Sequence, residues 1–226
     1  GGGIMGVSLL YHLAKEGWKD LVLVEKGELT SGSTWHAAGQ CPQMMGSYNL
    51  AKIHKESNNL YKKLEKETEQ PTGFHECGSL RIAYKKEDLD WFKYVKGILD
   101  NIGAPSEIIS TNEIRKVHPF IKLDGILGAF HTPDDGHTDP TSTTNAMAKG
   151  ARNYGAKIYR KNRVTDIKHL PSGEWKLITE KGDIICEHVV NAAGSYGPEV
   201  GAMVGLKNIP SINMIHHYLV TDEHPS

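Results

Sequence analysis

The first 25 residues, GGGIMGVSLLYHLAKEGWKDLVLVE (residues 1–25), decide the fold class. They contain the pattern G-x-G-x-x-G at Gly1, Gly3 and Gly6, followed by apolar residues at helical spacing and by the apolar run of residues 21–24. Glu25 ends that run, nineteen positions after Gly6. A glycine turn alone is weak evidence. A turn, a helix, a buried strand and a terminal acid at this spacing together predict a dinucleotide-binding unit of the Rossmann type.

Each part of this unit has a physical role. The glycines let the backbone approach a pyrophosphate, and the N-terminus of the helix supplies unpaired N–H groups. A carboxylate such as that of Glu25 can accept hydrogen bonds from ribose hydroxyls. The first strand of such a unit would precede Gly1, so we expect the chain to be part of a longer protein. A tight turn in an ordinary α/β protein is the alternative reading.

The composition predicts a soluble globular protein. Of its 226 residues, 38% are hydrophobic, and 26 basic residues stand against 27 acidic ones. A balanced charge argues against nucleic acid or an anionic membrane as the main partner. No apolar run approaches the roughly 20 residues that span a bilayer. The three widely separated cysteines indicate reduced thiols rather than a disulfide framework.

Local patterns predict the remaining elements. Ser110 and Glu113 form a capping-box pattern, and Asp139 is placed to cap a helix that begins with Pro140. The loop of residues 131–139 carries histidines and aspartates, but their spacing matches no zinc or calcium pattern, so we predict no metal there. Helices are predicted at residues 50–66, 87–101, 111–118 and 140–154, and strands at 78–84, 125–130, 157–159, 164–168, 175–179, 183–186, 188–191 and 214–221.

The run Ser-Thr-Trp-His at residues 33–36 lies in a segment of small residues directly after the strand that Glu25 ends. Small residues permit close contact with a bulky cofactor, and Ser31, Ser33 and Thr34 offer hydroxyls to phosphate oxygens. His36 could be a structural residue, a general base, a metal ligand or a covalent attachment point. Its position alone favours the structural role, because histidine is versatile and common in loops.

Four segments taken together carry a resemblance to a known family. They are residues 1–39, GFHECGSLRIA (73–83), DDGHTDPTS (134–142) and VVNAAGSYGPEVG (189–201). The chain resembles, from end to end, the dimethylglycine and sarcosine dehydrogenases, which are FAD-dependent enzymes of the D-amino-acid-oxidase-like superfamily. The resemblance implies an α/β fold in which a Rossmann-type FAD-binding domain is interleaved with a sheet-based substrate domain, with the first strand and the C-terminal part missing. The FAD-binding parts would be residues 1–45 and 140–205, and the substrate-domain segments 46–139 and 206–226.

The resemblance also implies which residues bind FAD. His36 stands where the family attaches FAD covalently, through the 8α-methyl group of the flavin. Val164 would contact the adenine through its backbone, and Tyr196 would lie beside the cofactor, where relatives usually have tryptophan. Core packing is the alternative role for both. The other cofactor-binding positions implied are Gly1, Gly3, Ile4, Met5, Gly6, Glu25, Lys26, Gly32, Ser33, Thr34, Trp35, Ala37, Ala38, Gly39 and Gln40.

His216 lies in the segment IHHYLVT (residues 215–221), next to His217. Adjacent residues of a strand point to opposite faces, so the two histidines cannot do the same job. The resemblance places His216 near the substrate as a catalytic residue. A buried or hydrogen-bonded strand histidine is the alternative.

The activity implied by the resemblance is oxidative demethylation of dimethylglycine or sarcosine, by hydride transfer to a covalently bound flavin. An electron-transfer flavoprotein or oxygen would accept the electrons, and tetrahydrofolate would bind only in a separate C-terminal domain. We expect a cytoplasmic location in a bacterium and the mitochondrial matrix in a eukaryote. The alternative is a catalytically inactive protein that resembles the regulatory subunit of pyruvate dehydrogenase phosphatase. A histidine at position 36 favours the enzyme.

Overall fold

The structure is a computed structural model that describes residues 1–217, 219–220 and 222. Its helices are α1 (Ile4–Lys15), α2 (Tyr48–Thr68), α3 (Lys86–Asn101), α4 (Thr111–Val117), α5 (Pro140–Asn153) and α6 (Gly197–Ala202), with 3₁₀ turns η1 (Ser33–His36) and η2 (Gly194–Tyr196). Its strands are β1 (Val22–Val24), β2 (Gln40–Cys41), β3 (Ser79–Ala83), β4 (Glu107–Ile109), β5 (Gly128–Thr132), β6 (Gly136–His137), β7 (Lys157–Tyr159), β8 (Val164–His169), β9 (Trp175–Thr179) and β10 (Ile184–Cys186).

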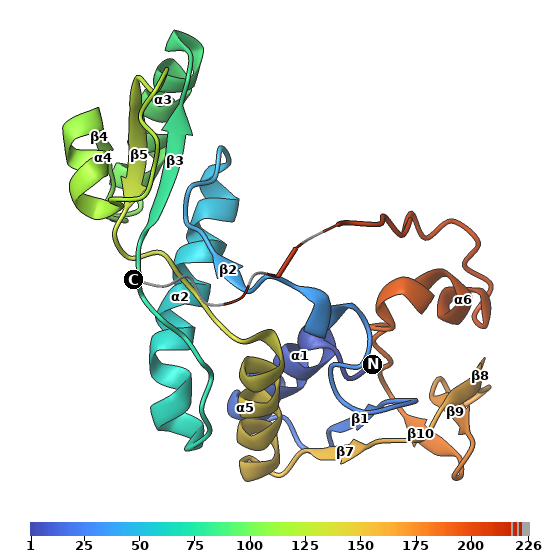
Figure 1. Cartoon of the computed structure of the whole chain (residues 1–226). Helices are drawn as coiled ribbons and strands as arrows, with labels where there is room; N and C mark the ends of the chain where they lie inside the picture. Colours follow the sequence, from blue (N-terminus) through green and yellow to red (C-terminus); the bar gives the residue numbers. More distant parts are fainter. Residues whose placement is uncertain (218, 221, 223–226) are drawn as a thin grey trace.

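One part of the fold is built on a parallel pair of strands. Strand β1 runs parallel to β7, with Val22 opposite Lys157, and helices α1 and α5 pack against each other beside them (Figure 1). Helix α1 buries Val7, Leu10, Tyr11 and Ala14, the stripe that its helical spacing predicts. These side chains share a core with alanines of α5. The parallel strands and flanking helices confirm the predicted α/β class.

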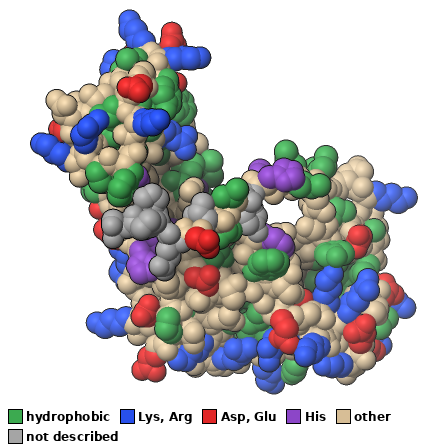
Figure 2. Space-filling model, in the orientation of Figure 1, with side chains coloured by type: hydrophobic (Ala, Val, Ile, Leu, Met, Phe, Trp, Pro, Cys, Tyr) green, Lys and Arg blue, Asp and Glu red, His purple; other side chains and the backbone are tan. Residues whose placement is uncertain are grey.

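A second lobe is antiparallel. Strand β5 lies between β3 and β4, and α3 covers the sheet by packing Phe92, Val95 and Leu99 against Phe130 of β5. Figure 1 shows this lobe standing away from β1, β7 and the β8–β10 sheet, with α2 running from one part to the other. The surface is hollowed between the two parts (Figure 2). Within the described ranges, no helix is long and apolar enough to cross a membrane.

Most predicted elements are confirmed. Asp139 caps α5 by accepting a 2.6 Å hydrogen bond from the Ser142 N–H, and Ser110 and Glu113 form the capping box of α4. Gly17, with φ of +91°, follows the end of α1 as predicted. Strand β5 begins at Gly128 rather than at residue 125 because Gly125 is in a left-handed turn. The sequence patterns gave no indication of the short strands β2, β4 and β6 or of α6, which have too few residues to show a periodicity.

Two predicted strands are wrong. Residues 188–191 form no strand, because Asn191 turns the chain: its Oδ1 accepts from the Ala193 N–H at 3.1 Å and its Nδ2 donates to the Gly197 carbonyl at 2.8 Å. In the predicted strand 214–221, residues 218 and 221 lie outside the described residues. The others belong to no strand, and they are exposed rather than packed on a neighbouring strand.

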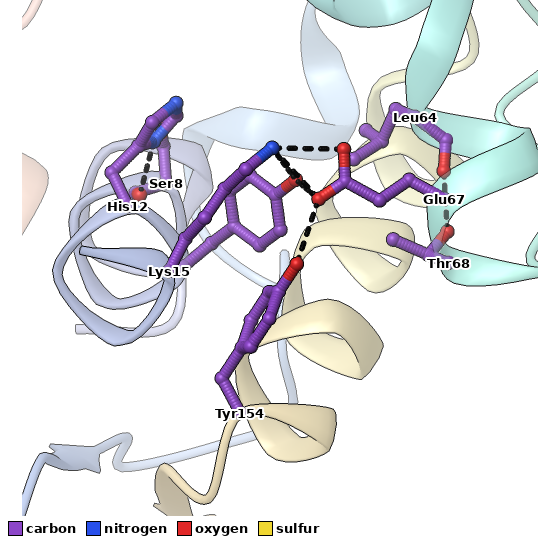
Figure 3. Close-up of polar contacts among 8 residues, drawn as sticks. Ser8, His12, Lys15, Leu64, Glu67, Thr68 and Tyr154 are labelled. Carbon is purple, nitrogen blue, oxygen red and sulfur yellow. Dashed lines mark hydrogen bonds and ion pairs between the residues drawn. The ribbon is translucent and has the colours of Figure 1, made fainter. Parts of the chain in front are cut away.

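A cluster around Glu67 joins three helices (Figure 3). Its carboxylate, on α2, accepts hydrogen bonds from the Tyr11 hydroxyl of α1 at 2.6 Å and from the Tyr154 hydroxyl, just after α5, at 3.0 Å. The Lys15 ammonium of α1 lies 2.8 Å from the same carboxylate. The ring of Tyr11 is fully buried, so the cluster closes one end of the core that α1, α2 and α5 share.

These contacts change the proton affinities of the cluster. Burial and the hydrogen bond to Glu67 raise the pKa of Tyr11 to about 12. Burial alone would raise the pKa of Glu67, but the hydrogen bonds from Lys15, Tyr11 and Tyr154 outweigh it and hold that pKa below its usual value. A carboxyl group whose pKa is lowered on folding stabilises the fold while it is ionised. This contribution is complete above the ordinary pKa of 4.5 and is lost as the pH falls through the lowered value.

We expect Glu67→Gln to lower the free energy of unfolding by about 1–2 kcal/mol at neutral pH. This extends below the usual range of about 1.5–3 kcal/mol for hydrogen bonds to a charged group, because Lys15 is partly exposed and solvent weakens its ion pair. Urea unfolding at a series of pH values measures the effect. The difference from wild type should vanish as the carboxylate is protonated. Glu56→Gln, at an exposed position of the same helix, is the control and should change little.

Candidate functional site

The glycine turn leads directly into α1. Gly3 is the N-cap of the helix, and the Thr34 hydroxyl accepts a 3.0 Å hydrogen bond from the Ile4 N–H. Helix geometry leaves the N–H groups of Met5 and Gly6 without acceptors inside the helix, so they are available to an anion. A side chain at Gly6 would collide with the Gly1 carbonyl oxygen, which explains the third glycine of the motif.

Glu25 connects the strand to this turn. Its Oε2 accepts from the Gly2 N–H at 2.5 Å and its Oε1 from the Gly27 N–H at 2.7 Å. Each carboxylate oxygen can accept a second hydrogen bond, so Glu25 can shape the turn and still bind a ribose hydroxyl. The sequence predicted only the second of these roles.

The segment after Glu25 carries His36 at the end of η1. The His36 side chain is exposed, and its ring centroid lies 3.8 Å from that of Trp35. Its Nδ1 is 3.2 Å from the Gly32 carbonyl oxygen, a contact that favours a proton on Nδ1 and leaves Nε2 for another bond. Gly32, Ser33, Ala37 and Ala38 are exposed as well, so this stretch presents a surface of small residues around His36.

The end of this segment is anchored to the start of α5. Gly39, with φ of +72°, accepts a 2.9 Å hydrogen bond at its carbonyl from the Thr138 N–H. Gln40 then pairs with His137 in the short ladder between β2 and β6. His36 is therefore held between two fixed points, the turn before α1 and the start of α5.

Two later segments reach the same region. The Asn162 N–H donates to the Glu25 carbonyl at 2.9 Å, which brings the start of β8, at Val164, close to the end of β1. The Lys26 ammonium lies 3.2 Å from the centre of the Tyr196 ring, a cation–π contact. Ala192 packs so closely on Gly1 that a side chain at Gly1 would collide with its carbonyl. The structure thus gathers the predicted positions in the glycine turn, at 25–26, in the His36 segment and at Tyr196, and it places Val164 beside them.

His216 does not lie with these predicted cofactor-binding residues. It is exposed and lies in a segment without secondary structure. Among the residues that the structure describes, no group of histidine, cysteine, aspartate and glutamate side chains is arranged to hold a metal ion.

Sequence reasoning missed Thr30. It is buried, its φ is +67°, and its N–H donates to the Gly2 carbonyl at 2.9 Å. Glycine or asparagine would have signalled a left-handed residue, whereas threonine does not. No pattern in the sequence could have identified this position.

Comparisons with known proteins agree with this geometry. The family model of FAD dependent oxidoreductases matches residues 1–226. The chain is 45% identical over 225 residues to "Dimethylglycine dehydrogenase, mitochondrial" of Rattus norvegicus, covering 100% of this chain and 26% of the relative. It is 36% identical to "Pyruvate dehydrogenase phosphatase regulatory subunit, mitochondrial" of Mus musculus, covering 98% of this chain and 25% of the relative. The chain thus spans about a quarter of the length of these curated relatives.

A solved structure shares the fold. The L-proline dehydrogenase of P. horikoshii superimposes with a TM-score of 0.84 and 30% sequence identity, over 92% of this chain and 55% of that one. The resemblance to dimethylglycine dehydrogenase that the sequence motifs carry is therefore confirmed. The glycine turn, the strand β1 that leads to Glu25 and the His36 segment lie together in space, and the family model matches the chain along its whole length. The chain therefore belongs to the FAD-dependent oxidoreductase family.

Proposed function

We propose that this chain holds FAD in an enzyme that oxidatively demethylates a small N-methylated glycine, either dimethylglycine or sarcosine. The observation that carries the proposal is the 45% identity to dimethylglycine dehydrogenase over the whole chain, in which His36 is exposed beside the glycine turn. FAD would be bound covalently through His36. The domain boundaries expected from the sequence, at residues 45, 139 and 205, belong to this proposal.

The residues present fit FAD. The open N–H groups of Met5 and Gly6 suit the pyrophosphate, and Glu25 has acceptor capacity left for the ribose. The start of β8, at Val164, lies close to the end of β1, and its backbone would contact the adenine. The Lys26 ammonium and the Tyr196 ring contact each other, and together they would border the dinucleotide on one side. The flavin would then extend toward η1, where His36 is the exposed side chain that can form the bond.

The bound flavin supplies an acceptor for two electrons. Oxidation of the substrate transfers a hydride from its N-methyl carbon and leaves an iminium, which water converts to formaldehyde and the demethylated amine. The amine must lose its ammonium proton before this transfer, because only the free nitrogen lone pair can form the iminium. The protein has two tasks: to hold the N-methyl carbon of the substrate against the cofactor, and to keep the substrate amine unprotonated. We propose His216 for the proton, since histidine exchanges protons near neutral pH.

Partners of the whole protein belong to the same proposal. An electron-transfer flavoprotein or oxygen would reoxidise the enzyme, and tetrahydrofolate in a separate C-terminal domain could capture the one-carbon unit. We place the enzyme in the mitochondrial matrix of a eukaryote or the cytoplasm of a bacterium.

A second candidate is a regulatory protein without catalytic activity. It is favoured by the 36% identity to the phosphatase regulatory subunit. The two candidates differ in one measurement: only the enzyme's flavin is reduced when dimethylglycine or sarcosine is added without oxygen.

We expect His36→Ala in the full-length protein to abolish covalent flavin while FAD still binds without a bond, because the glycine turn and Glu25 remain intact. After acid precipitation, the yellow colour should stay with the wild-type pellet and pass into the supernatant for the variant. Peptide mapping that finds the flavin on another residue would contradict the assignment.

We expect Glu25→Ala to weaken FAD binding by about 1–3 kcal/mol, since it removes a charged acceptor and releases two N–H groups of the turn. Titration with FAD in the His36→Ala background measures this without the covalent bond. Glu28→Ala is the control, because that exposed acid, three residues further on, pairs with Arg160 and Lys161 instead. Equal losses in the two variants would show that Glu25 acts only as a surface charge.

We expect His216→Gln in the complete enzyme to slow flavin reduction and to change its pH profile, with folding little affected. His217→Gln is the matched control and should do neither, since it removes the neighbouring imidazole and leaves His216 in place. Single-turnover reduction by dimethylglycine and sarcosine across pH is the measurement. Wild-type rates for His216→Gln at every pH would make this histidine structural.

A further inference from the structure

Thr30 has an unusual backbone conformation. Its φ of +67° lies in the left-handed region, where a side chain branched at Cβ is a genuine outlier. The other described residues with positive φ that are not glycine are Asp20, Glu69 and Lys161, and all three are exposed and unbranched at Cβ. Thr30, by contrast, is only 5% exposed. A strained conformation at a buried residue persists only where the surroundings impose it.

Two hydrogen bonds impose it here. The Thr30 N–H donates to the Gly2 carbonyl at 2.9 Å, within the glycine turn. The Thr141 hydroxyl, in the first turn of α5, donates to the Thr30 hydroxyl at 3.4 Å. Thr30 is therefore fixed between the two structures that bound the His36 segment.

Thr30 begins the short loop that leads to His36. The chain reverses at Thr30 and returns four residues later to the glycine turn, where the Thr34 hydroxyl accepts from the Ile4 N–H. These two attachments close residues 30–34 against the start of α1, and His36 follows two residues after the second. The direction in which η1 leaves this closed loop is set by the backbone at Thr30.

We propose that Thr30 is a positioning residue that presents His36 for attachment of the flavin. The inference rests on the covalent attachment proposed above, in which a bond from the His36 ring nitrogen would replace a C–H bond of the flavin methyl group. Two protons would leave to solvent, and oxygen would take up the two electrons released. A glycine at position 30 would adopt the same φ without strain, so relief of the backbone strain alone would stabilise the fold. Threonine adds a hydroxyl that accepts a hydrogen bond from the Thr141 hydroxyl, while its branching at Cβ makes this φ unfavourable. The hydrogen bond holds the loop to α5, and the strained φ is its cost in stability.

The test uses full-length apoprotein incubated with FAD, and follows acid-stable flavin with time together with the unfolding temperature. We expect Thr30→Gly to unfold at the wild-type temperature or above it, yet to attach flavin at least about tenfold more slowly, because small misplacements of a reacting group have effects of this size. Thr30→Ser keeps the hydroxyl and should recover most of the rate. Asp20→Gly relieves a similar backbone conformation at an exposed position and should leave attachment unchanged.

A purely structural role would move stability and attachment together, whereas the proposal separates them. If the wild-type protein contains covalent flavin and Thr30→Gly attaches flavin at the wild-type rate, the role of Thr30 is overturned and the proposed function stands. Absence of acid-stable flavin from the wild-type protein overturns both. If Thr30→Gly does not fold, Thr30→Ser and Thr30→Ala decide: faster attachment by the serine variant supports the proposal, and equal rates overturn it.

Discussion

The hydrogen bonds of Glu25 are the interactions on which the arrangement of this region depends. The backbone of Glu25 donates to the Tyr159 carbonyl and accepts from the Asn162 N–H, which continues the pairing of β1 with β7. Its side chain holds the N–H groups of Gly2 and Gly27. One residue thus connects the sheet, the glycine turn and the start of the segment that carries His36. The acid at this position thus shapes the turn through its own hydrogen bonds, before any ligand binds.

The helices supply the rigid frame around this point. Helix α1 packs against α5, and both meet α2 at the Glu67 cluster. Helix α2 also holds the chain just after the His36 segment: the Asn58 amide donates to the Cys41 carbonyl at 3.0 Å, and His54 Nδ1 lies 2.7 Å from the Pro42 carbonyl oxygen. The segment between Glu25 and Pro42 is therefore attached to rigid elements along its length, although it contains little regular structure itself. A site on a loop gains its accuracy from such attachments.

Much of this could be predicted from the sequence, for identifiable reasons. The stripe of Val7, Leu10, Tyr11 and Ala14 and the capping residues Ser110 and Asp139 are local signals, and each specifies an element without knowledge of the rest. The strand predicted at residues 188–191 failed because a strand needs a partner, and apolar residues alone do not provide one. Thr30 could not be found because its conformation is imposed by Gly2 and Thr141, which are distant in sequence. The exposed position of His36 depends in the same way on contacts between distant segments.

The parallel pairing of β1 with β7 has a consequence for the order in which the protein folds. Val22 pairs with Lys157, 135 positions later, and the lobe of β3, β4 and β5 is formed entirely by the residues between them. During synthesis β1 leaves the ribosome long before β7 exists, and closing so long a loop carries an entropic cost that only the finished pair repays. The inserted lobe pairs strands that are closer in sequence than β1 and β7, and it can form first because all of its residues are made before β7. Until α5 is made, the apolar face of α1 lacks the partners that α5 supplies, and until β7 follows, the edge of β1 lacks its partner strand. A chaperone that covers them would act in this interval.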